Sequence, residues 1–366
     1  MKILQTPARI FATGGVESYV RNLSRELVGM GHDVGVICAD GPGENDIDQR
    51  IHTKTLKSRG KIANTSINPY LPLALYREDF DILHTHLPTP WSADWSGLIS
   101  RLKKRPLVLT YHNDIVGEGW AGQIAWIYNK TALKLLLKSA GGIIVTRNRY
   151  VSPYLKDYAS KVFFVPLGID VDAFRPKEAP PKGDIFFLSV LDEFHRYKGL
   201  EVLFAALKIM KQELPDVRLV VGGRGCMFDH YRRMADSLGI GDNVSFAGFV
   251  PSKKLIEYYN GCKLFALPST DPRREGFGIV PLEAMACERP VVVTEIMGMA
   301  GDINECGAGM VARCNDKEAL ASSMLAILKD DDLARRMGAE GRKLAIGKYS
   351  WRRAAEQIER VYRELL

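Results

Sequence analysis

The sequence lacks the features that mark several large classes of protein. Its six cysteines are scattered, without a Cys-x-x-Cys pair, and this argues against a zinc site or a dense disulfide framework. No apolar stretch approaches the roughly 18 residues of a membrane span, and Met1 opens directly onto a short apolar run instead of the layout of a signal peptide. These absences predict a soluble, intracellular protein with buried thiols.

Two common nucleotide-binding motifs are also missing. Gly223 and Gly225 begin a dinucleotide fingerprint, but Phe228 stands where the third glycine is needed. The stretch from Gly341 to Lys348 has the wrong spacing for a P-loop and is followed by tyrosine instead of Ser or Thr. A nicotinamide-dependent enzyme and a P-loop kinase or ATPase are both disfavoured.

What is present is enough apolar sequence for two domains. The chain has 366 residues, of which 46% are hydrophobic and 25% charged, and this is too long for one ordinary core. The net charge of +7 lies wholly in the first half: residues 1–165 hold 21 Lys and Arg against 14 Asp and Glu, and residues 166–366 hold 29 of each. The asymmetry suggests an anionic partner, such as a membrane surface, a phosphorylated lipid or a sugar phosphate, and a merely solvated basic face explains it equally well.

Strand and helix patterns alternate along the chain, which predicts parallel sheets covered by helices. The first series has strands near residues 2–5, 33–38, 81–86, 106–111, 142–146 and 161–165, a helix after Gly15, and helices near 92–102 and 121–139. After a proline-rich stretch at 176–183, read as a linker, the second series has strands near 185–191, 217–222, 244–249, 263–267 and 290–294, and helices near 199–213, 228–238, 252–260 and 278–287. The last fifty residues read as helices alone.

This pattern predicts an α/β fold of two Rossmann-like domains with parallel sheets that face a central cleft. The N-terminal domain spans residues 1–170, and a C-terminal helix at about 350–366 crosses back to it. The second domain spans residues 171–349. Because ligands of open α/β sheets bind at the carboxyl ends of the strands, residues that follow strands are the candidate site residues.

Two such loops suit phosphate groups. Gly14 and Gly15 follow the first strand and open a helix, where glycine allows close backbone approach and the helix N-terminus supplies N–H donors. Arg196 and Lys198 follow the strand at 185–191, and two cations there suit a diphosphate. A solvated basic loop is the competing interpretation. Gly223 ends another strand and is a further candidate for backbone contact with the ligand.

The most informative segment runs from Glu275 to Glu283. If both glutamates were helical, they would stand about 12 Å apart along the axis, too far for the roughly 5 Å carboxylate pair of a retaining glycosidase. We expect them to hold two parts of one ligand, with Glu275 accepting from sugar hydroxyls and Glu283 accepting from a ribose diol. The intervening Gly276, Phe277 and Gly278 form the loop that leads into the helix.

Histidines end two neighbouring strands. His84 and His86 close one strand and His112 the other, so all three are expected at one edge of the sheet. A metal interpretation is weak, because no carboxylate or cysteine accompanies them at ligand spacing. We therefore expect no metal site.

Taken together, these segments resemble glycosyltransferase family 4, also called group 1, over nearly the whole chain. The resemblance rests on the order and spacing of the following motifs: Gly14-Gly15, Gly31-His32-Asp33-Val34, His84 to His86, Thr110 to His112, Gly168-Ile169-Asp170 with Phe174, Lys198-Gly199, and the pair Glu275 and Glu283. The glutamate pair is the most specific of them. The closing segment from Tyr349 also resembles the final helix of the family.

The resemblance implies a GT-B fold and a role for each matching residue. The Gly15 amide and Lys198 would bind the donor diphosphate, Glu275 the sugar and Glu283 the ribose, and His112 would line the reaction centre. The base would lie near Phe249 and Val250, mostly against the backbone. One departure concerns the first strand of the second domain, where the family usually has Gly-Arg and this sequence has Ser189-Val190. Arg196 could reach the same phosphate by another route.

The function so predicted is a retaining, metal-independent transfer of a hexose from a UDP- or GDP-sugar, with no cofactor besides this donor substrate. The acceptor stays open among lipid-linked, phosphorylated and glycan-precursor molecules, and nucleic acid is not expected. Trp120 and Trp126 before Lys130 suggest a membrane surface, and with it a cytoplasmic protein held peripherally on the inner membrane face. A helix with aromatic residues in the core and solvated lysines outside is the competing interpretation. A nucleotide-sugar 2-epimerase and a non-catalytic GT-B binding subunit are the alternatives.

Overall fold

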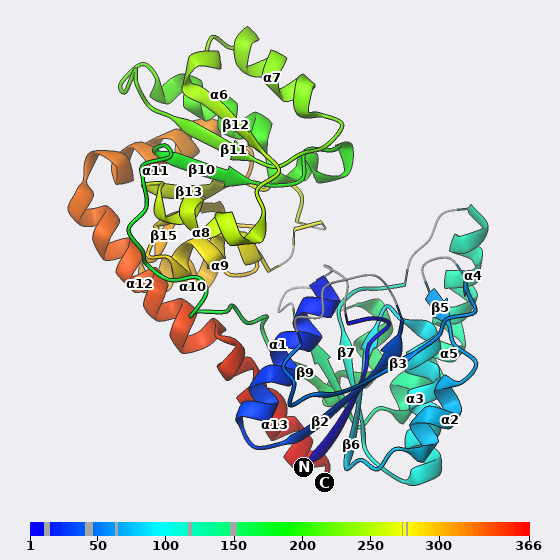
Figure 1. Cartoon of the computed structure of the whole chain (residues 1–366). Helices are drawn as coiled ribbons and strands as arrows, with labels where there is room; N and C mark the ends of the chain where they lie inside the picture. Colours follow the sequence, from blue (N-terminus) through cyan, green and yellow to red (C-terminus); the bar gives the residue numbers. More distant parts are fainter. Residues whose placement is uncertain are drawn as a thin grey trace. The chain divides into compact units, whose positions relative to one another are not determined.

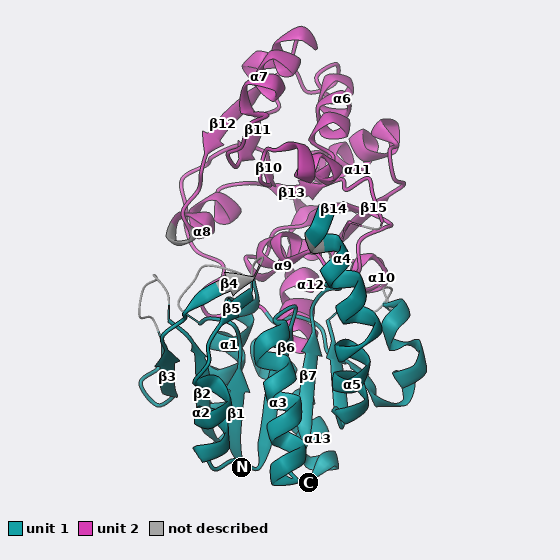
Figure 2. Cartoon of the chain, turned by 90° about the vertical axis from the view of Figure 1, so that its right-hand side faces the viewer, with its two compact units in different colours: residues 1–168, 351–366 teal, residues 169–350 magenta. Residues whose placement is uncertain are grey.

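The computed structural model describes residues 1–10, 15–40, 47–62, 65–115, 119–146, 152–272, 274–275 and 277–366. The chain divides into two compact units (Figure 2): residues 1–168 with 351–366 form unit 1, and residues 169–350 form unit 2. Each unit is an α/β domain built on its own parallel sheet. No helix in this described part of the chain is long and apolar enough to cross a bilayer.

Unit 1 has a seven-stranded parallel sheet in the order β3-β2-β1-β6-β7-β8-β9 (Figure 1). The strands are β1 (Lys2–Thr6), β2 (Asp33–Ala39), β3 (His52–Leu56), β6 (Ile82–Leu87), β7 (Leu107–Tyr111), β8 (Gly142–Val145) and β9 (Val162–Phe164), with a separate antiparallel pair of β4 (Gly60–Ile62) and β5 (Thr65–Ile67). Every residue of β6 and β7 is buried, as expected for central strands covered on both faces.

Helices cover the two faces of this sheet (Figure 1). One face carries α1 (Gly15–Gly29) and α13 (Trp351–Leu365), and the other carries α2 (Leu71–Arg77), α3 (Pro90–Lys103), α4 (Gly119–Lys130) and α5 (Ala132–Ser139), with the short helix η1 (Pro153–Lys161) after them. Alternate strand residues feed the two apolar cores: Leu83 packs with α2, α3 and α5, and the neighbouring Ile82 packs with α1 and α13.

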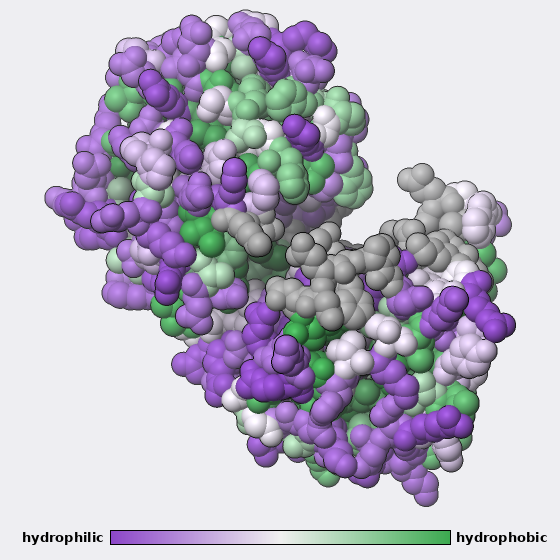
Figure 3. Space-filling model, in the orientation of Figure 1, coloured by the Kyte–Doolittle hydropathy of each residue, from purple (hydrophilic) through white to green (hydrophobic). Residues whose placement is uncertain are grey.

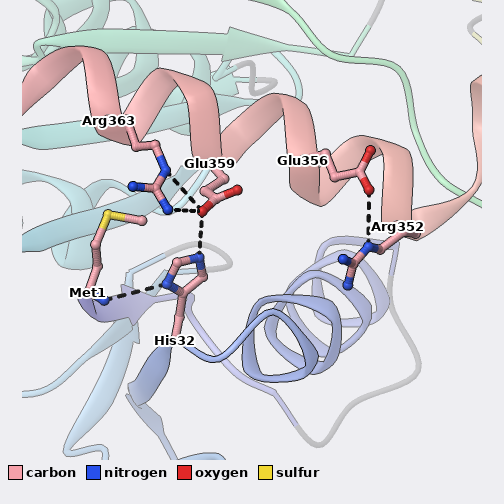
Figure 4. A network of polar contacts seen from close by, with 6 residues as sticks. All are labelled: Met1, His32, Arg352, Glu356, Glu359 and Arg363. Atoms are coloured by element: carbon pink, nitrogen blue, oxygen red, sulfur yellow. Dashed lines mark hydrogen bonds and ion pairs between the residues drawn. The ribbon is translucent and has the colours of Figure 1, made fainter.

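Helix α13 is joined to unit 1 by apolar and polar contacts. Its buried residues recur at helical spacing from Trp351 to Tyr362. On its other side, Glu359 accepts from Arg363 and lies 3.1 Å from Nε2 of His32, whose Nδ1 is 3.5 Å from the amino group of Met1 (Figure 4). The last helix of the chain therefore packs beside the first helix, α1, within unit 1.

Unit 2 has a six-stranded parallel sheet in the order β12-β11-β10-β13-β14-β15. The strands are β10 (Ile185–Leu188), β11 (Leu219–Gly222), β12 (Val244–Gly248), β13 (Leu264–Leu267), β14 (Val291–Thr294) and β15 (Gly309–Ala312). The helices are η2 (Glu193–Lys198), α6 (Leu200–Met210), α7 (Phe228–Ser237), η3 (Gly241–Asn243), α8 (Ser252–Asn260), α9 (Ile279–Ala286), α10 (Ala300–Cys306), α11 (Lys317–Lys329) and α12 (Asp331–Tyr349).

The α/β architecture and every strand predicted from the sequence are confirmed, with ends shifted by a few residues. Strands β3, β4, β5 and β15 and helices α2 and α10 were not predicted, because each is short and lacks a long apolar period. The helix expected at 121–139 is broken at Thr131, whose backbone leaves the helical region and whose hydroxyl donates to the carbonyl of Ile127 at 2.7 Å. A threonine bonded in this way competes with the helix ladder.

Two expectations require correction. The stretch at 176–183 is not a linker between the units but a part of unit 2, where the Lys182 amide donates to the Gly261 carbonyl at 2.8 Å. The chain instead leaves unit 1 at Gly168, where a Cβ would come within 2.6 Å of the Trp351 backbone, so that only glycine allows this approach. The cysteines are all free, but Cys226 is exposed and two others are half-buried.

Candidate active site

The predicted donor-binding residues of unit 2 meet at the point where the strand order of its sheet reverses. Strand β10 pairs on one side with β11, the next strand along the chain, and on the other side with β13, which comes later in the chain. The connections that leave β10 and β13 therefore start beside each other, and in open α/β sheets such a reversal at the carboxyl ends of the strands is where ligands bind. The first connection carries Lys198 and the second carries Glu275.

Close backbone packing joins these two connections. Gly199, with φ of +81°, ends η2, and a Cβ there would lie 1.9 Å from the Pro268 carbonyl oxygen, so any side chain would collide with backbone. The Thr270 amide donates to the Tyr197 carbonyl at 2.7 Å. At the start of η2, Asp192 accepts from the His195 amide at 2.8 Å and caps the helix. The loop that carries Lys198 is thus held at both ends.

Lys198 and Glu275 form a buried ion pair. The Lys198 ammonium lies 2.9 Å and 3.1 Å from the two carboxylate oxygens of Glu275, and their side chains are only 17% and 2% exposed. The buried Ser269 hydroxyl donates to the same carboxylate. An ammonium has three N–H donors, and two of them suffice for Glu275. The arrangement places a fixed cation and a fixed acceptor at this edge of the sheet.

Glu283 lies on α9, beyond the glycine-bearing loop. Helix α9 starts after Gly278, whose φ of +89° and contact with Met297 favour glycine. The Tyr259 hydroxyl donates to Glu283 at 2.6 Å. Burial raises the pKa of Glu283 to about 7, although the Tyr259 hydrogen bond acts to lower it. Phe277, predicted to touch the ligand, is buried edge-on against Tyr349 at 5.0 Å and so supports the loop from within unit 2.

The other predicted residues of unit 2 are spread along the same edge of the sheet. Gly223 follows β11 with φ of +132°, and a Cβ there would lie 1.7 Å from the Ser189 carbonyl oxygen. Phe249 is 68% exposed and Val250 is buried, both directly after β12. Arg196 pairs with Glu201 at 2.8 Å, on the outer side of its loop, and is half exposed. Gly276 lies outside the described residues.

The corresponding reversal in unit 1 lies between β1 and β6, and β7 stands next to β6. Gly15, which opens α1, is exposed with open space around its Cα, whereas Gly14 lies outside the described residues. The three predicted histidines do come together: His86 stacks on His84 at 4.6 Å and on His112 at 5.7 Å between ring centroids. The Tyr19 ring meets His112 edge-on at 4.8 Å.

Two of these histidines, His84 and His86, are fully buried, and His112 is half-buried. His84 bridges the Tyr362 hydroxyl at 2.6 Å and the Thr110 hydroxyl at 2.7 Å, and burial lowers its pKa to about 3. Burial also lowers the pKa of His86 well below its ordinary value. Two neutral imidazoles therefore support the His112 ring from beneath. Among the described residues, no three His, Cys, Asp or Glu side chains are grouped so that they could hold a metal ion.

Sequence reasoning missed the residues that hold the predicted ones in place. Ser269, two residues after the strand predicted at 263–267, supports Glu275, and nothing in its local sequence indicates that contact. Thr294, at the end of β14, donates to the Ser269 carbonyl at 2.7 Å. Tyr259 sits on α8 at an ordinary core spacing, and nothing in the sequence marks it as the partner of Glu283. These contacts join residues of different strands and helices, about 25 residues apart in the chain for Thr294 with Ser269 and for Tyr259 with Glu283.

Two family models match this chain and together span most of it. The model described as Glycosyltransferase Family 4 matches residues 13–173, and the model described as Glycosyl transferases group 1 matches residues 170–344. The boundary between the two matches falls close to the boundary between the units. The chain belongs to the group 1 glycosyltransferases.

Curated relatives of this glycosyltransferase match over nearly their whole length. A phosphatidyl-myo-inositol mannosyltransferase of Mycobacterium leprae is 26% identical, over 95% of this chain and 92% of the relative. A D-inositol 3-phosphate glycosyltransferase of Corynebacterium jeikeium is also 26% identical, over 96% and 92%. A GDP-mannose-dependent alpha-(1-6)-phosphatidylinositol monomannoside mannosyltransferase of Mycolicibacterium smegmatis is 27% identical, over 93% and 92%.

Solved structures place this glycosyltransferase in the GT-B fold. HepE from Anabaena, determined in complex with UDP, has a TM-score of 0.76 and 20% identity, with both chains fully covered. Sucrose-phosphate synthase from Thermosynechococcus elongatus has a TM-score of 0.70 and 23% identity, over 100% of this chain and 99% of that one. The fold expected from the resemblance is thereby confirmed.

Proposed function

We propose that this glycosyltransferase is a retaining, metal-independent hexosyltransferase that uses a UDP- or GDP-hexose. The observation that carries the proposal is the buried pair of Lys198 and Glu275 at the strand-order reversal of unit 2. A nucleotide sugar needs a cation for its diphosphate and a fixed acceptor for its sugar hydroxyls, and this pair supplies both. Mannosyl transfer from GDP-mannose is the first candidate, because one relative is named for that donor.

Each predicted residue receives a role in donor binding. The third N–H of Lys198 donates to the diphosphate, and its donation strengthens as the leaving group gains charge. Glu275, held by Lys198 and Ser269, accepts from the sugar hydroxyls. Glu283 accepts from the ribose diol, with Tyr259 fixing its carboxylate. The nucleotide then extends along the same edge of the sheet toward Gly223, Phe249 and Val250.

Arg196 is the least supported member of this proposal. Its guanidinium already contacts Glu201 and Glu193, so it must exchange these partners before it can reach a phosphate. Its half-exposed side chain permits that exchange. Val190, which stands where the family usually has arginine, is exposed and offers no charge. Lys198 therefore provides most of the electrostatic stabilisation.

We assign the acceptor to unit 1. There the His112 ring, supported by His86, lines the acceptor side. The named relatives act on phosphatidylinositol-type lipids and on an inositol phosphate. The shared chemistry is a polyol that carries a phosphate, and we propose such an acceptor here. With a lipid acceptor the enzyme would work peripherally on the cytoplasmic face of the membrane.

The proposed reaction breaks the bond between the anomeric carbon and the diphosphate oxygen and forms a bond from the acceptor oxygen to the same carbon. Departure and attack take place on the same face of the sugar, so the configuration is retained. The acceptor proton leaves with the nucleoside diphosphate. The chain contributes charge stabilisation and positioning rather than a nucleophile of its own.

A panel of UDP-, GDP- and ADP-sugars tests the donor assignment by thermal stabilisation and slow donor hydrolysis. We expect one nucleotide class to stabilise the wild type, with both responses lost in Lys198→Ala and hydrolysis lost in Glu275→Ala. Lys263→Ala is the matched control, because Lys263 pairs with Asp184 at 3.1 Å in the same unit, at the opposite end of the strands. Absence of any response to nucleotide sugars would refute the proposal and favour a non-catalytic subunit. A change of the sugar without an acceptor would favour the 2-epimerase.

A further inference from the structure

The two helical faces of unit 1 differ in how much apolar side chain they expose. On α1 and α13, every apolar side chain is buried or half-buried. Helices α2 to α5 cover the other face, where α3 contacts α2 and α5, and α5 contacts α4 (Figure 2). Their large exposed apolar residues are Leu73, Tyr76, Leu98, Leu102, Trp120, Ile124, Trp126, Ile127 and Leu135. We call these four helices the α2–α5 face.

The two faces also differ in net charge, because the α2–α5 face has almost no acidic residues. Helices α1 and α13 carry six Lys and Arg and five Glu, whereas α2 to α5 carry six Lys and Arg and a single acid, Asp94. Asp94 is half-buried and accepts from the Tyr128 hydroxyl at 2.7 Å, so it scarcely offsets the cations at the surface. Most of the basic excess in the first half of the sequence therefore lies on the α2–α5 face.

The exposed residues lie on the helices as an interfacial helix requires. On α4, Trp120, Ile124 and Ile127 recur at spacings of four and three and share one exposed stripe. Lys130 lies 4.0 Å above the ring of Trp126, whereas the half-buried Lys103, 5.7 Å from the ring of Tyr76, donates to the carbonyls of Tyr76 and Glu78. Long cationic side chains that lie along exposed aromatic rings can keep their charge at lipid headgroups while the rings enter the boundary layer.

We propose that the α2–α5 face docks unit 1 on the surface of an anionic lipid bilayer. The apolar stripe of α4 enters the boundary between headgroups and acyl chains, and the lysines of α4 and α5 contact the headgroups. In the space-filling view, green and pale side chains alternate with purple ones at the edge of unit 1 where Figure 1 places α4 (Figure 3). The lack of exposed acids selects a negatively charged surface rather than a mixed-charge protein partner. This docking does not rest on the proposed transfer reaction.

Flotation of the full chain with lipid vesicles tests the proposal. One set of vesicles contains one part phosphatidylglycerol to two parts phosphatidylcholine, and the other contains phosphatidylcholine alone. We expect binding to the first set only, and weaker binding as salt shortens the range of the charges. A lysine variant, with Lys130→Ser, Lys134→Ser and Lys138→Ser, should bind on the order of 100-fold more weakly, at about 1 kcal/mol for each cation near the surface.

An apolar variant with Trp120→Ser, Ile124→Ser and Ile127→Ser should also lose binding. The matched control carries Arg352→Ser, Arg353→Ser and Arg360→Ser, which removes three exposed cations from α13 on the other face, and it should bind like the wild type. Unchanged melting temperatures and donor hydrolysis in all variants would show that docking alone has changed.

Three outcomes would overturn the proposal. The first is an absence of vesicle binding by the wild type, and the second is an equal loss in the lysine variant and the α13 control, since binding would then follow net charge alone. The third is a wild-type dimer in sedimentation that the apolar variant abolishes without any effect on vesicle binding, which would assign the face to a second copy of the chain.

Discussion

Breaking the pair of Lys198 and Glu275 should have unequal effects on stability, depending on which partner is removed. In Lys198→Met, the Glu275 carboxylate keeps Ser269 but loses its cation, with only 2% of its side chain exposed. Two unit charges 3 Å apart attract by about 5 kcal/mol at an effective dielectric constant of 20. Stranding one partner of a buried pair typically costs about 3 to 5 kcal/mol.

We therefore expect Lys198→Met to lower the free energy of unfolding of unit 2 by about 3 kcal/mol. At roughly 2 to 4 °C for each kcal/mol in a domain of this size, its Tm should fall by about 6 to 12 °C. Glu275→Gln should cost only about 1 kcal/mol, because the amide still bonds Ser269 and the Lys198 side chain, 17% exposed, still reaches water. Differential scanning calorimetry of both variants without ligand measures the asymmetry.

Two comparisons make this reasoning refutable. Lys263→Met breaks an exposed pair in the same unit, with the lysine 58% exposed, and should cost less than about 1 kcal/mol. The double change Lys198→Met with Glu275→Leu should be more stable than Lys198→Met alone, because it removes the stranded charge. If Lys198→Met lowers Tm no more than Lys263→Met, then Glu275 is not the buried, charge-dependent acceptor on which the donor site is built.

Three further predictions follow from other contacts. Gly223→Ala would place a Cβ 1.7 Å from a backbone oxygen and should unfold unit 2, as a loss of its circular dichroism signal would show. Gly239→Asn, at φ of +74° in open space, should leave Tm within about 3 °C of the wild type. Tyr259→Phe removes the hydrogen bond that lowers the pKa of Glu283, so nucleotide binding, measured by calorimetry, should require a higher pH than in the wild type; an unchanged profile would exclude Glu283 from ribose binding. Because the pKa of His84 falls from 6.5 unfolded to about 3 folded, protonation of His84 alone should cost unit 1 about 1.6 kcal/mol as pH drops from 6.5 to 5. Burial lowers the pKa of His86 in the same direction, so His84→Gln should weaken that dependence of Tm without abolishing it.

How far the sequence predicts the site depends on whether a residue acts alone or through a partner. Lys198 and Glu275 were predicted because each follows a buried strand, and in a parallel sheet all carboxyl ends of strands share one edge. Their ion pair was not predictable, since they are 77 residues apart and meet only because β10 and β13 are neighbours. The contact of Ser269 with Glu275 was not predictable for the same reason, because it depends on the order of the strands.

In unit 1, too, the sequence predicted the positions of single residues but not their contacts with distant partners. The sequence indicated that His84 and His86 end one strand and His112 another, because alternation and turn residues are local signals. It did not indicate that all three rings stack, or that His84 reaches Tyr362, which is 278 residues away on α13. Burial then decides the charge of His84, because desolvation acts on the folded environment and leaves no mark in composition.

The sequence by itself thus determined the succession of strands and helices, the loops that bear charge, and the family to which their order belongs. The tertiary structure alone decided which loops stand together, because strand order departs from chain order at β10 and at β1. It also decided that Lys130 of α4 lies beside the exposed ring of Trp126, whereas Arg352 and Arg363 of α13 pair with glutamates. Local periodicity specifies elements, but only packing determines which residues become neighbours.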